Sequence, residues 1–257
     1  MGLRDLRGPI VALALLAGAG RVEAQGGYEI QVYGADLVER GRTMLELHSN
    51  FTPDGVRDPA GGLRSSRHAL HETLEITRGF SDWFEVGFYL FTSLRPGAGP
   101  EWVGDHVRPR VRAPASWRWP VGASLSVEVG PERRSYFGDT WSLEVRPIVD
   151  RRMGRWYWSV NPALERALGG TADPQWEFAP GATVTLDVAK ALTVGLEYYG
   201  GFGPVSGFDP PDAQSQQLFP VVWLHVSPEW ELNAGAGFGL TPATDRLTAK
   251  LIVGRRL

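Results

Sequence analysis

The chain has 257 residues and a mass of 28.2 kDa, with 43% apolar and 21% charged residues and a formal net charge of −3. Its 10 Trp, 11 Phe and 7 Tyr argue against a disordered chain, and the absence of Cys excludes disulfides and thiolate metal sites. The slightly acidic balance also argues against nucleic-acid binding.

A secretory signal is predicted at the N-terminus. Arg4 and Arg7 precede a short apolar run from Pro9 to about Ala19, and small residues follow up to Ala24. A positive start, a short apolar stretch and a small-residue cleavage site are typical of an export signal. The predicted division of the chain is a signal peptide, residues 1–24, cleaved after Ala24; a short periplasmic segment, residues 25–41; and one domain, residues 42–257.

Beyond residue 41 the apolar residues follow a period of two. In one stretch Leu125, Val127 and Val129 alternate with Ser126 and Glu128. Because successive strand side chains point to opposite faces, each such stretch has one apolar face and one face of small or charged groups. About twelve segments show this pattern, beginning near Arg42, His68, Trp83, Val103, Val121, Thr140, Trp156, Gln175, Leu192, Ser215, Trp230 and Arg246. Most extend to the roughly 9–11 residues of a tilted transmembrane strand, whereas strands of soluble sandwiches average about 5–6.

The connections between these segments alternate in length. One set is short, as at Trp119-Pro120 and Ala189–Ala191, and the other is mostly longer and rich in Gly, Pro and Asp, as at Pro53–Arg67 and Pro204–Gln214. Short turns on one rim and long loops on the other are typical of outer-membrane barrels. The sequence therefore predicts an all-β fold, a closed antiparallel transmembrane β-barrel of about 12 strands with short periplasmic turns and longer extracellular loops.

Three segments, GFSDWFEVGFYLF, VAKALTVGLEYYGGFG and VSPEWELNAGAGFGL, resemble the periplasmic hairpins of Gram-negative outer-membrane β-barrels. More narrowly, they are similar to the transporter-like barrels grouped with the phenol-degradation outer-membrane proteins. The resemblance covers most of residues 42–257 and implies passage of a small solute. Such barrels usually end in an aromatic residue that the insertion machinery recognises, whereas this chain ends in Leu257.

Charged residues are expected on the inward face, because Arg or Lys facing lipid near the bilayer centre costs about 2–4 kcal/mol. The candidate lumen-lining residues are Glu46, Glu75, Glu85, His106, Arg108, Arg110, Arg112, Glu128, Glu144, Arg146, Glu165, Glu177, Glu197, Glu231 and Lys250. Alternate residues from His106 to Arg112 form a basic ladder. One interpretation is a track for an anionic solute, since guanidinium groups bind carboxylate or phosphate bidentately. The alternative, which the excess of inward acids favours, is a structural ion-pair network with Glu85 and Glu128.

Tryptophans cluster beside the short turns, where indole rings favour the boundary between water and lipid. The candidate interface aromatics are Trp83, Trp117, Trp119, Trp156, Trp158 and Trp230. One charge departs from the pattern, because alternation places Glu72 on the outward face between Leu70 and Leu74. A bulge, or a position near the rim, would account for it.

Signals for catalysis and metal binding are weak. The stretch HALHE contains His68, His71 and Glu72, but strand residues three apart point to opposite faces, so no metal site and no cofactor is predicted. Ser66, close to these histidines, is the only candidate nucleophile for a lipid hydrolase. No GxSxG, phosphate-loop or dinucleotide motif accompanies it.

The prediction from sequence is a non-enzymatic barrel of a bacterial outer membrane that mediates passive or facilitated passage of a small solute through a charge-lined lumen. Its expected partners are outer-membrane lipids and a small-molecule solute, with no nucleic acid, and the pattern defines no oligomeric state. The main alternative is a closed barrel with a structural or surface-interaction role. An outer-membrane lipid hydrolase is less favoured.

Overall fold

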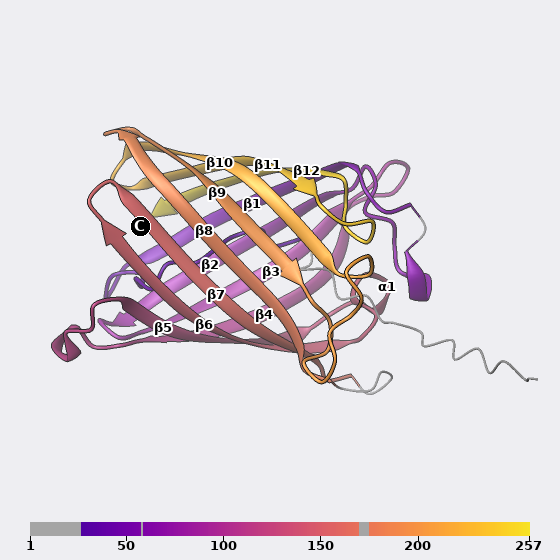
Figure 1. Cartoon of the computed structure of the whole chain (residues 1–257), viewed down its shortest axis with the longest axis horizontal. Helices are drawn as coiled ribbons and strands as arrows, with labels where there is room; N and C mark the ends of the chain where they lie inside the picture. The colour runs from indigo at the N-terminus through magenta and orange to yellow at the C-terminus, as the bar shows by residue number, and fades with distance from the viewer. Residues whose placement is uncertain (1–26, 58, 170–174) are drawn as a thin grey trace, which may run out of the picture.

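The structure is a closed β-barrel. The computed structural model describes residues 27–57, 59–169 and 175–257, so the predicted signal peptide lies outside the described residues. Twelve strands form in the described residues: β1 (Thr43–Asp54), β2 (Leu70–Ser81), β3 (Phe84–Leu94), β4 (Glu101–Arg112), β5 (Gly122–Pro131), β6 (Trp141–Met153), β7 (Trp156–Ala167), β8 (Glu177–Ala189), β9 (Leu192–Gly201), β10 (Ser215–Ser227), β11 (Trp230–Gly239) and β12 (Leu247–Arg256). Neighbours in sequence pair antiparallel, and β1 pairs with β12 to close the sheet (Figure 1). The predicted fold class is confirmed.

Alternation located every strand start to within two residues, but it placed the end of β4 too late. The sequence predicted a turn at Trp119-Pro120, whereas β4 ends at Arg112 and a longer connection follows. Pro114 has no N–H to donate to the hydrogen-bond ladder of the sheet, and the short 3-10 helix η2 (Ala115–Trp117) follows it. The connection therefore projects from the rim instead of turning tightly.

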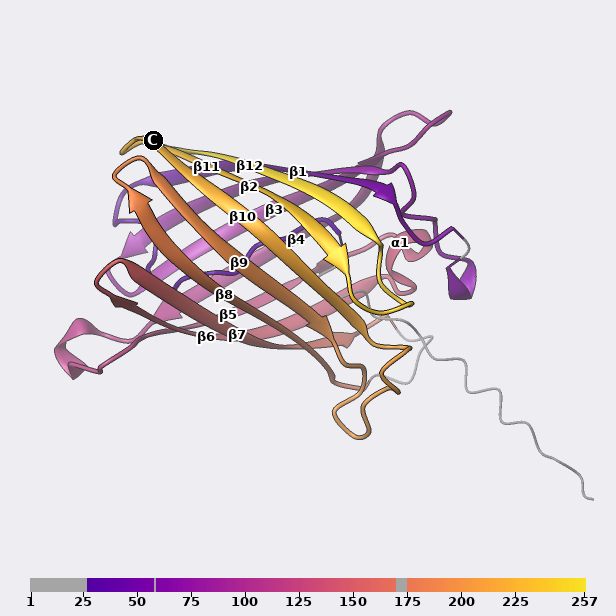
Figure 2. The ribbon, with the colours of Figure 1, turned by 45° about the horizontal axis from the view of Figure 1, so that its top comes forward.

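The two rims of the barrel differ in the length of their connections. Two-residue turns follow β2, β6, β8 and β10, and the C-terminus lies at the same rim. The opposite rim carries the longer connections, including residues 55–69 with the 3-10 helix η1 (Ala60–Gly62) and residues 132–140 with the short helix α1 (Arg134–Phe137). Figure 2 shows these connections grouped at the end opposite the C-terminus. We call the two ends the short-turn rim and the long-loop rim.

The outer surface of the barrel is apolar. Along β1, Leu45, Leu47 and Phe51 are exposed, whereas the alternate residues Glu46 and His48 are buried inside. The predicted interface tryptophans are exposed near the short-turn rim except Trp158, which is half-buried; they are Trp83, Trp117, Trp119, Trp156, Trp158 and Trp230. Two further exposed tryptophans, Trp102 and Trp141, lie at the starts of β4 and β6, near the long-loop rim. Among the described residues, no helix has the length and apolar character needed to cross a membrane.

Glu72 lies near the long-loop rim, close to the start of β2. The register between β1 and β2 is unbroken from Thr43 to Phe51, so no bulge displaces Glu72. Its carboxylate accepts a 2.8 Å hydrogen bond from the hydroxyl of Ser49, its partner across the strand pair. The rim position, one of the two explanations offered by the sequence, therefore accounts for this outward charge.

The residues before β1 lie inside the barrel. Tyr28 packs near the long-loop rim, where its ring centroid is 5.2 Å from that of Phe137 in α1. Twelve residues later Arg40 bridges to Gly79, near the short-turn rim, and Gly41 reverses the chain into β1 with a φ of 80°. Residues 28–40, the luminal segment, thus run through the lumen from one rim to the other. The sequence predicted a short periplasmic segment at residues 25–41, whereas residues 28–40 lie within the barrel, where their backbone supplies the partners of buried polar side chains in the wall.

Candidate functional site

The lumen is the candidate site, and side chains of the wall hold the middle of the luminal segment there. The N–H of Tyr33 donates to Asn161 Oδ1 (2.7 Å), and its carbonyl accepts from Asn161 Nδ2 (2.9 Å) and Ser159 Oγ (2.6 Å). The next fixed point is Ala35, whose N–H donates to Asp150 Oδ2 (2.8 Å). Buried polar groups need such partners, so the segment and the wall satisfy one another.

Near the long-loop rim the segment is held in the same way. The carbonyl of Tyr28 accepts hydrogen bonds from Asn50 Nδ2 (3.1 Å) and Thr73 Oγ1 (2.7 Å). Lys250 Nζ donates to the carbonyl of Ile30 at 3.0 Å. These bonds come from β1, β2 and β12, on the side of the barrel where the sheet closes.

Towards the short-turn rim, β3 and β4 hold the segment. Arg110 donates to the carbonyl of Gly34 (3.3 Å) and to that of Asp36. The N–H of Val38 donates to Glu85 Oε2 at 2.6 Å. Hydrogen bonds to charged groups contribute about 1.5–3 kcal/mol each, so these contacts anchor the segment firmly.

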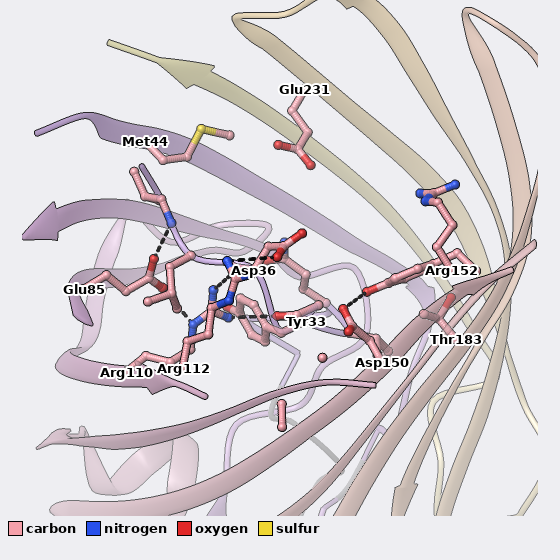
Figure 3. A pocket seen from close by; sticks show the side chains of 18 of the residues that line it. Tyr33, Asp36, Met44, Glu85, Arg110, Arg112, Asp150, Arg152, Thr183 and Glu231 are labelled. Atoms are coloured by element: carbon pink, nitrogen blue, oxygen red, sulfur yellow. Dashed lines mark hydrogen bonds and ion pairs between the residues drawn. The ribbon is translucent and has the colours of Figure 1, made fainter. Parts of the chain in front are cut away.

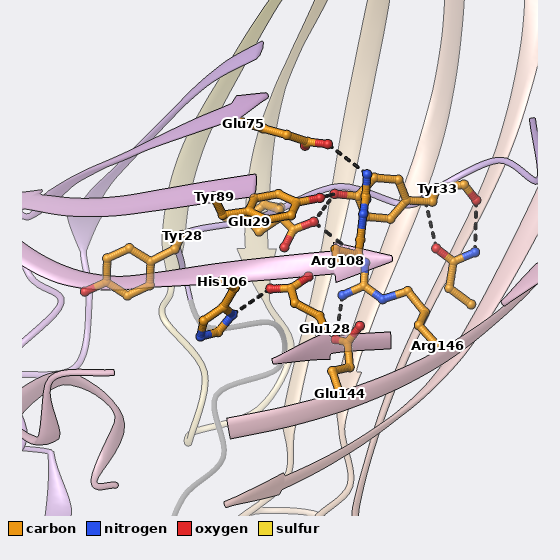
Figure 4. A network of polar contacts seen from close by, with 12 residues as sticks. Tyr28, Glu29, Tyr33, Glu75, Tyr89, His106, Arg108, Glu128, Glu144 and Arg146 are labelled. Carbon is orange, nitrogen blue, oxygen red and sulfur yellow. Dashed lines mark hydrogen bonds and ion pairs between the residues drawn. The ribbon is translucent and has the colours of Figure 1, made fainter. Parts of the chain in front are cut away.

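Three cations surround the ring of Tyr33. The guanidinium carbons of Arg108, Arg146 and Arg110 lie 4.5, 5.1 and 5.6 Å from its centroid. The hydroxyl of Tyr33 donates to Glu29, an acid of the same segment (Figure 4). Because cation–π contacts strengthen when they are desolvated, this ring is a central anchor of the segment.

Carboxylates neutralise the cations around Tyr33. Arg108 lies 2.8 Å from Glu75 and 3.6 Å from Glu85, and Arg110 Nε lies 2.8 Å from Glu85. Arg146 lies 2.6 Å from Glu144. Together with the luminal segment, these pairs form a polar layer across the lumen.

A large cavity of about 1270 Å³ lies on the short-turn side of this layer. It extends to the short-turn rim, because Arg151, Arg152 and the β4–β5 connection line it. Figure 3 shows Glu231 and Arg152 on the wall facing the segment. The cavity is therefore a polar vestibule with charges of both signs.

A small cavity of about 160 Å³ lies towards the long-loop rim, and acids dominate its lining. The acidic lining residues are Glu29, Glu128, Glu132, Asp139, Glu144, Glu165 and Glu177; the basic ones are His106, Arg146 and Arg166. Among the described residues, the two cavities share no lining residue. The luminal segment and its polar layer thus separate them.

Four of these acids form a row across neighbouring strands. Glu128 pairs in register with Glu144, Glu144 with Glu165, and Glu165 with Glu177. Like charges directly opposite each other on adjacent strands repel. His106 lies 2.7 Å from Glu128 and Arg146 lies beside Glu144, but within the described chain neither Glu165 nor Glu177 forms an ion pair. This glutamate row therefore places at least two acidic side chains without an ion-pair partner among the described residues beside the small cavity.

All the residues predicted to line the lumen are buried or half-buried there. Those that line the large cavity are Glu46, Glu75, Glu85, Arg108, Arg110, Arg112, Glu197 and Glu231. Those that line the small cavity are His106, Glu128, Glu144, Arg146, Glu165 and Glu177. Lys250 is buried against the carboxylate of Glu197 and the carbonyl of Ile30.

The basic ladder on β4 forms ion pairs. Arg108 and Arg110 pair with carboxylates of β2 and β3, and Arg112 lies 3.1 Å from Asp36 of the luminal segment. Glu128, expected as a partner of these arginines, pairs with His106 instead. This arrangement agrees with the ion-pair network rather than with a free basic track.

The candidate catalytic and metal residues of the β1–β2 loop and the start of β2 do not converge. His71 is buried inside, with its ring centroid 4.2 Å from that of Tyr28, whereas Glu72 is on the outward face. Ser66 donates a 2.5 Å hydrogen bond to Asp245 Oδ1 and accepts one from the N–H of Val56. The hydroxyl therefore links two loops of the long-loop rim.

Two groups of lumen residues were missed by the reasoning from sequence. One is the luminal segment, whose Tyr28 and Ile30 alternate with Glu29 and Gln31 and so carried a weak period-two signal. The other is the buried histidine His48, which lies two residues after Glu46 and hence on the same face. Both signals were visible in the pattern of alternation.

The comparisons with known proteins bear on the fold. No family model matches the chain, and no curated protein matches it significantly. An outer membrane channel from Pseudomonas putida F1 is 11% identical with a TM-score of 0.59, over 89% of this chain and 100% of the other. The NanC porin is 8% identical with a TM-score of 0.55, over 82% and 97%, and the KdgM porin is 6% identical with a TM-score of 0.53, over 82% and 98%. At these identities the likeness establishes a shared barrel fold.

Proposed function

We propose that the protein is an outer-membrane channel for a small solute and that the luminal segment is its gate. The observation that carries this proposal is the large cavity, which keeps about 1270 Å³ of charged lumen hollow behind a segment held by noncovalent contacts. Barrels of about eight strands can be filled by side chains, whereas 16–18 strands leave a channel, so twelve strands around a noncovalently held segment suit a gated pore.

The outer surface supports a position in the outer membrane. Exposed leucines on alternate residues and tryptophans near both rims match the apolar band and aromatic girdles of outer-membrane barrels. Lipids of that membrane are then the partners of the exterior. The titles of the similar structures name porins and an outer membrane channel, which favours passage of solutes in general. The narrower grouping with phenol-degradation barrels rests on the hairpin sequences alone.

The distribution of charge favours cations over anions at the long-loop rim. The lumen arginines Arg108 and Arg110 are engaged by carboxylates and by the luminal segment, whereas Glu165 and Glu177 of the glutamate row have no ion-pair partner among the described residues and could bind a cation. Low-dielectric walls focus the field of such a row into the lumen. We therefore assign a small cationic or zwitterionic solute to this channel.

Planar-bilayer recording of the purified full-length protein tests the proposal. The intact protein should show low conductance with rare openings, because the luminal segment separates the two cavities. Replacing Asn161 with Ala removes two hydrogen bonds to Tyr33 and should increase the time spent open. If neither protein conducts ions, the alternative of a closed structural barrel holds.

A further inference from the structure

A histidine and two glutamates meet inside the barrel on the first two strands. Glu46 and His48 lie two residues apart on the inward face of β1, and Glu75 of β2 is the register partner of Glu46. One donor atom from each side chain lies within 4.8 Å of those of the other two. Their side chains converge from two hydrogen-bonded strands, so the cluster belongs to the rigid wall.

His48 is fully buried, yet neither of its ring nitrogens has a hydrogen-bond partner within the described residues. Its Nε2 faces Glu75 Oε2 at 3.5 Å, and that oxygen also lacks a hydrogen bond. A buried imidazole usually donates at least one hydrogen bond, because its removal from water otherwise has no compensation. Nε2 of His48 and the free oxygen of Glu75 thus lie close to each other without a hydrogen bond between them.

The other contacts of the cluster leave one oxygen of Glu75 available. Arg108 and Thr77 occupy Glu75 Oε1 at 2.8 and 2.7 Å, which fixes the orientation of the carboxylate and leaves Oε2 free. Outer-shell hydrogen bonds of this kind are typical around carboxylate ligands of metals. Glu46 and Glu75 also line the large cavity, so an ion can reach them from the short-turn rim.

We propose that Glu46, His48 and Glu75 form a binding site for a divalent transition metal, with Zn²⁺ as the representative ion. Imidazole with carboxylates suits Zn²⁺, Co²⁺ or Ni²⁺, whereas Ca²⁺ and Mg²⁺ prefer oxygen ligands alone. Zn²⁺ lies about 2.0–2.2 Å from nitrogen and oxygen ligands, so two ligands of one ion are roughly 3–4 Å apart. Small side-chain rotations bring the three donors to that spacing, and water from the cavity supplies a fourth ligand. The site does not depend on whether the barrel conducts a solute.

Metal titration of the full-length folded protein in detergent micelles tests this site. After removal of metals with a chelator, isothermal titration calorimetry with Zn²⁺ should show one equivalent bound. Co²⁺ should give the visible absorption bands of a site of low symmetry. His48→Ala should weaken Zn²⁺ binding by more than about tenfold, the loss that even a change outside the ligand shell can cause. Glu46→Gln, which preserves size, should also weaken binding.

His225→Ala is the matched control. His225 lines the same cavity and contacts Thr193 at 2.9 Å, but it is not part of the cluster. Its variant should bind Zn²⁺ as the unmodified protein does. Circular dichroism and a heat-dependent shift in migration on gels establish that each variant is folded. The proposal fails if the unmodified protein binds no stoichiometric Zn²⁺, if Glu46→Gln and folded His48→Ala bind it normally, or if His225→Ala abolishes binding.

Discussion

The guanidinium of Arg110 lies 2.8 Å from the carboxylate of Glu85, and each of the two side chains also holds the backbone of the luminal segment. Arg110 donates to the carbonyls of Gly34 and Asp36, while Glu85 accepts from the N–H of Val38. One ion pair of the wall thus holds two carbonyls and one amide of the luminal segment.

Replacing Arg110 with Ala should therefore open the lumen. The substitution removes two hydrogen bonds to the segment and takes from Glu85 its nearest cationic partner. Breaking a buried ion pair in this way destabilises the network by about 3–5 kcal/mol. In planar bilayers we expect a higher open probability. Arg152→Ala is the control, because Arg152 lines the same cavity but pairs with Asp187 at the rim. Unchanged conductance in Arg110→Ala would argue against the gate.

A methyl group on Gly79 should also displace the end of the luminal segment. A Cβ at this position would collide with the backbone oxygens of Val38 and Glu39, which are not free to move aside like a flexible side chain. We expect Gly79→Ala to expose residues near the gate to added protease and to increase conductance. The same change at Gly99, where a Cβ would meet open space, should do neither. Identical digestion of the two variants would contradict this prediction.

Neutralising Glu165 should reduce the preference of the lumen for cations. Glu165 lies between Glu144 and Glu177 in the glutamate row, and its variant Glu165→Gln removes an acid that could bind a cation there. The reversal potential in a salt gradient should move towards the anion side, because the lumen loses one acid that could bind a cation. Glu229→Gln, at an exposed turn of the other rim, provides the comparison. Equal reversal potentials would exclude the glutamate row from the conduction path.

A charge on the outer surface should test contact with lipid. Leu196 lies in the middle of β9 and is 48% exposed. In a bilayer, Leu196→Arg should lower the free energy of unfolding by about 2–4 kcal/mol, whereas Leu240→Arg, beyond the end of β11, should cost about 0–1 kcal/mol. Urea unfolding of both variants in lipid vesicles measures the difference. Equal small costs would show that the middle of the barrel does not face hydrocarbon.

The stability that Asp245 contributes to the folded protein should fall as pH rises. Burial raises the pKa of Asp245 above its ordinary 3.8, although hydrogen bonds from Ser66 and the N–H of Val56 act in the opposite direction. Because the folded state favours the neutral acid, its stabilisation is present below pH 3.8 and is lost as pH rises through the raised pKa. Urea unfolding of the protein, repeated across this pH range, should show this loss. Asp245→Asn keeps the acceptor and should remove the pH dependence; an unchanged profile would contradict the assignment.

Most of the barrel could be predicted from sequence because alternation is a local property. Each inward glutamate or outward leucine is recognised from its immediate neighbours, which is why the start of β7 at Trp156 and that of β9 at Leu192 were located without error. The end of β4 was misplaced because Pro114 ends the ladder without interrupting the run of aromatic and basic residues.

The gate could not be predicted in this way, because its partners are distant in sequence. Tyr33 meets Asn161, and Ala35 meets Asp150, across more than a hundred intervening residues. Alternation shows that Asn161 faces inward, but it does not show which group forms hydrogen bonds with its side chain there. Nor does it show that Glu46 and His48 converge with Glu75, since that depends on the register between two strands.

Recognition of the luminal segment through its backbone has a consequence for how the protein tolerates sequence change. The amides of Ala35 and Val38 and the carbonyls of Ile30 and Gly34 exist whatever side chains those positions carry, unless one becomes proline. Selection for this closed form therefore acts more strongly on the wall residues that form hydrogen bonds to the main chain than on these positions. Related barrels could keep the same obstruction with a segment whose sequence has drifted beyond recognition, provided that the amides and carbonyls meet the same wall.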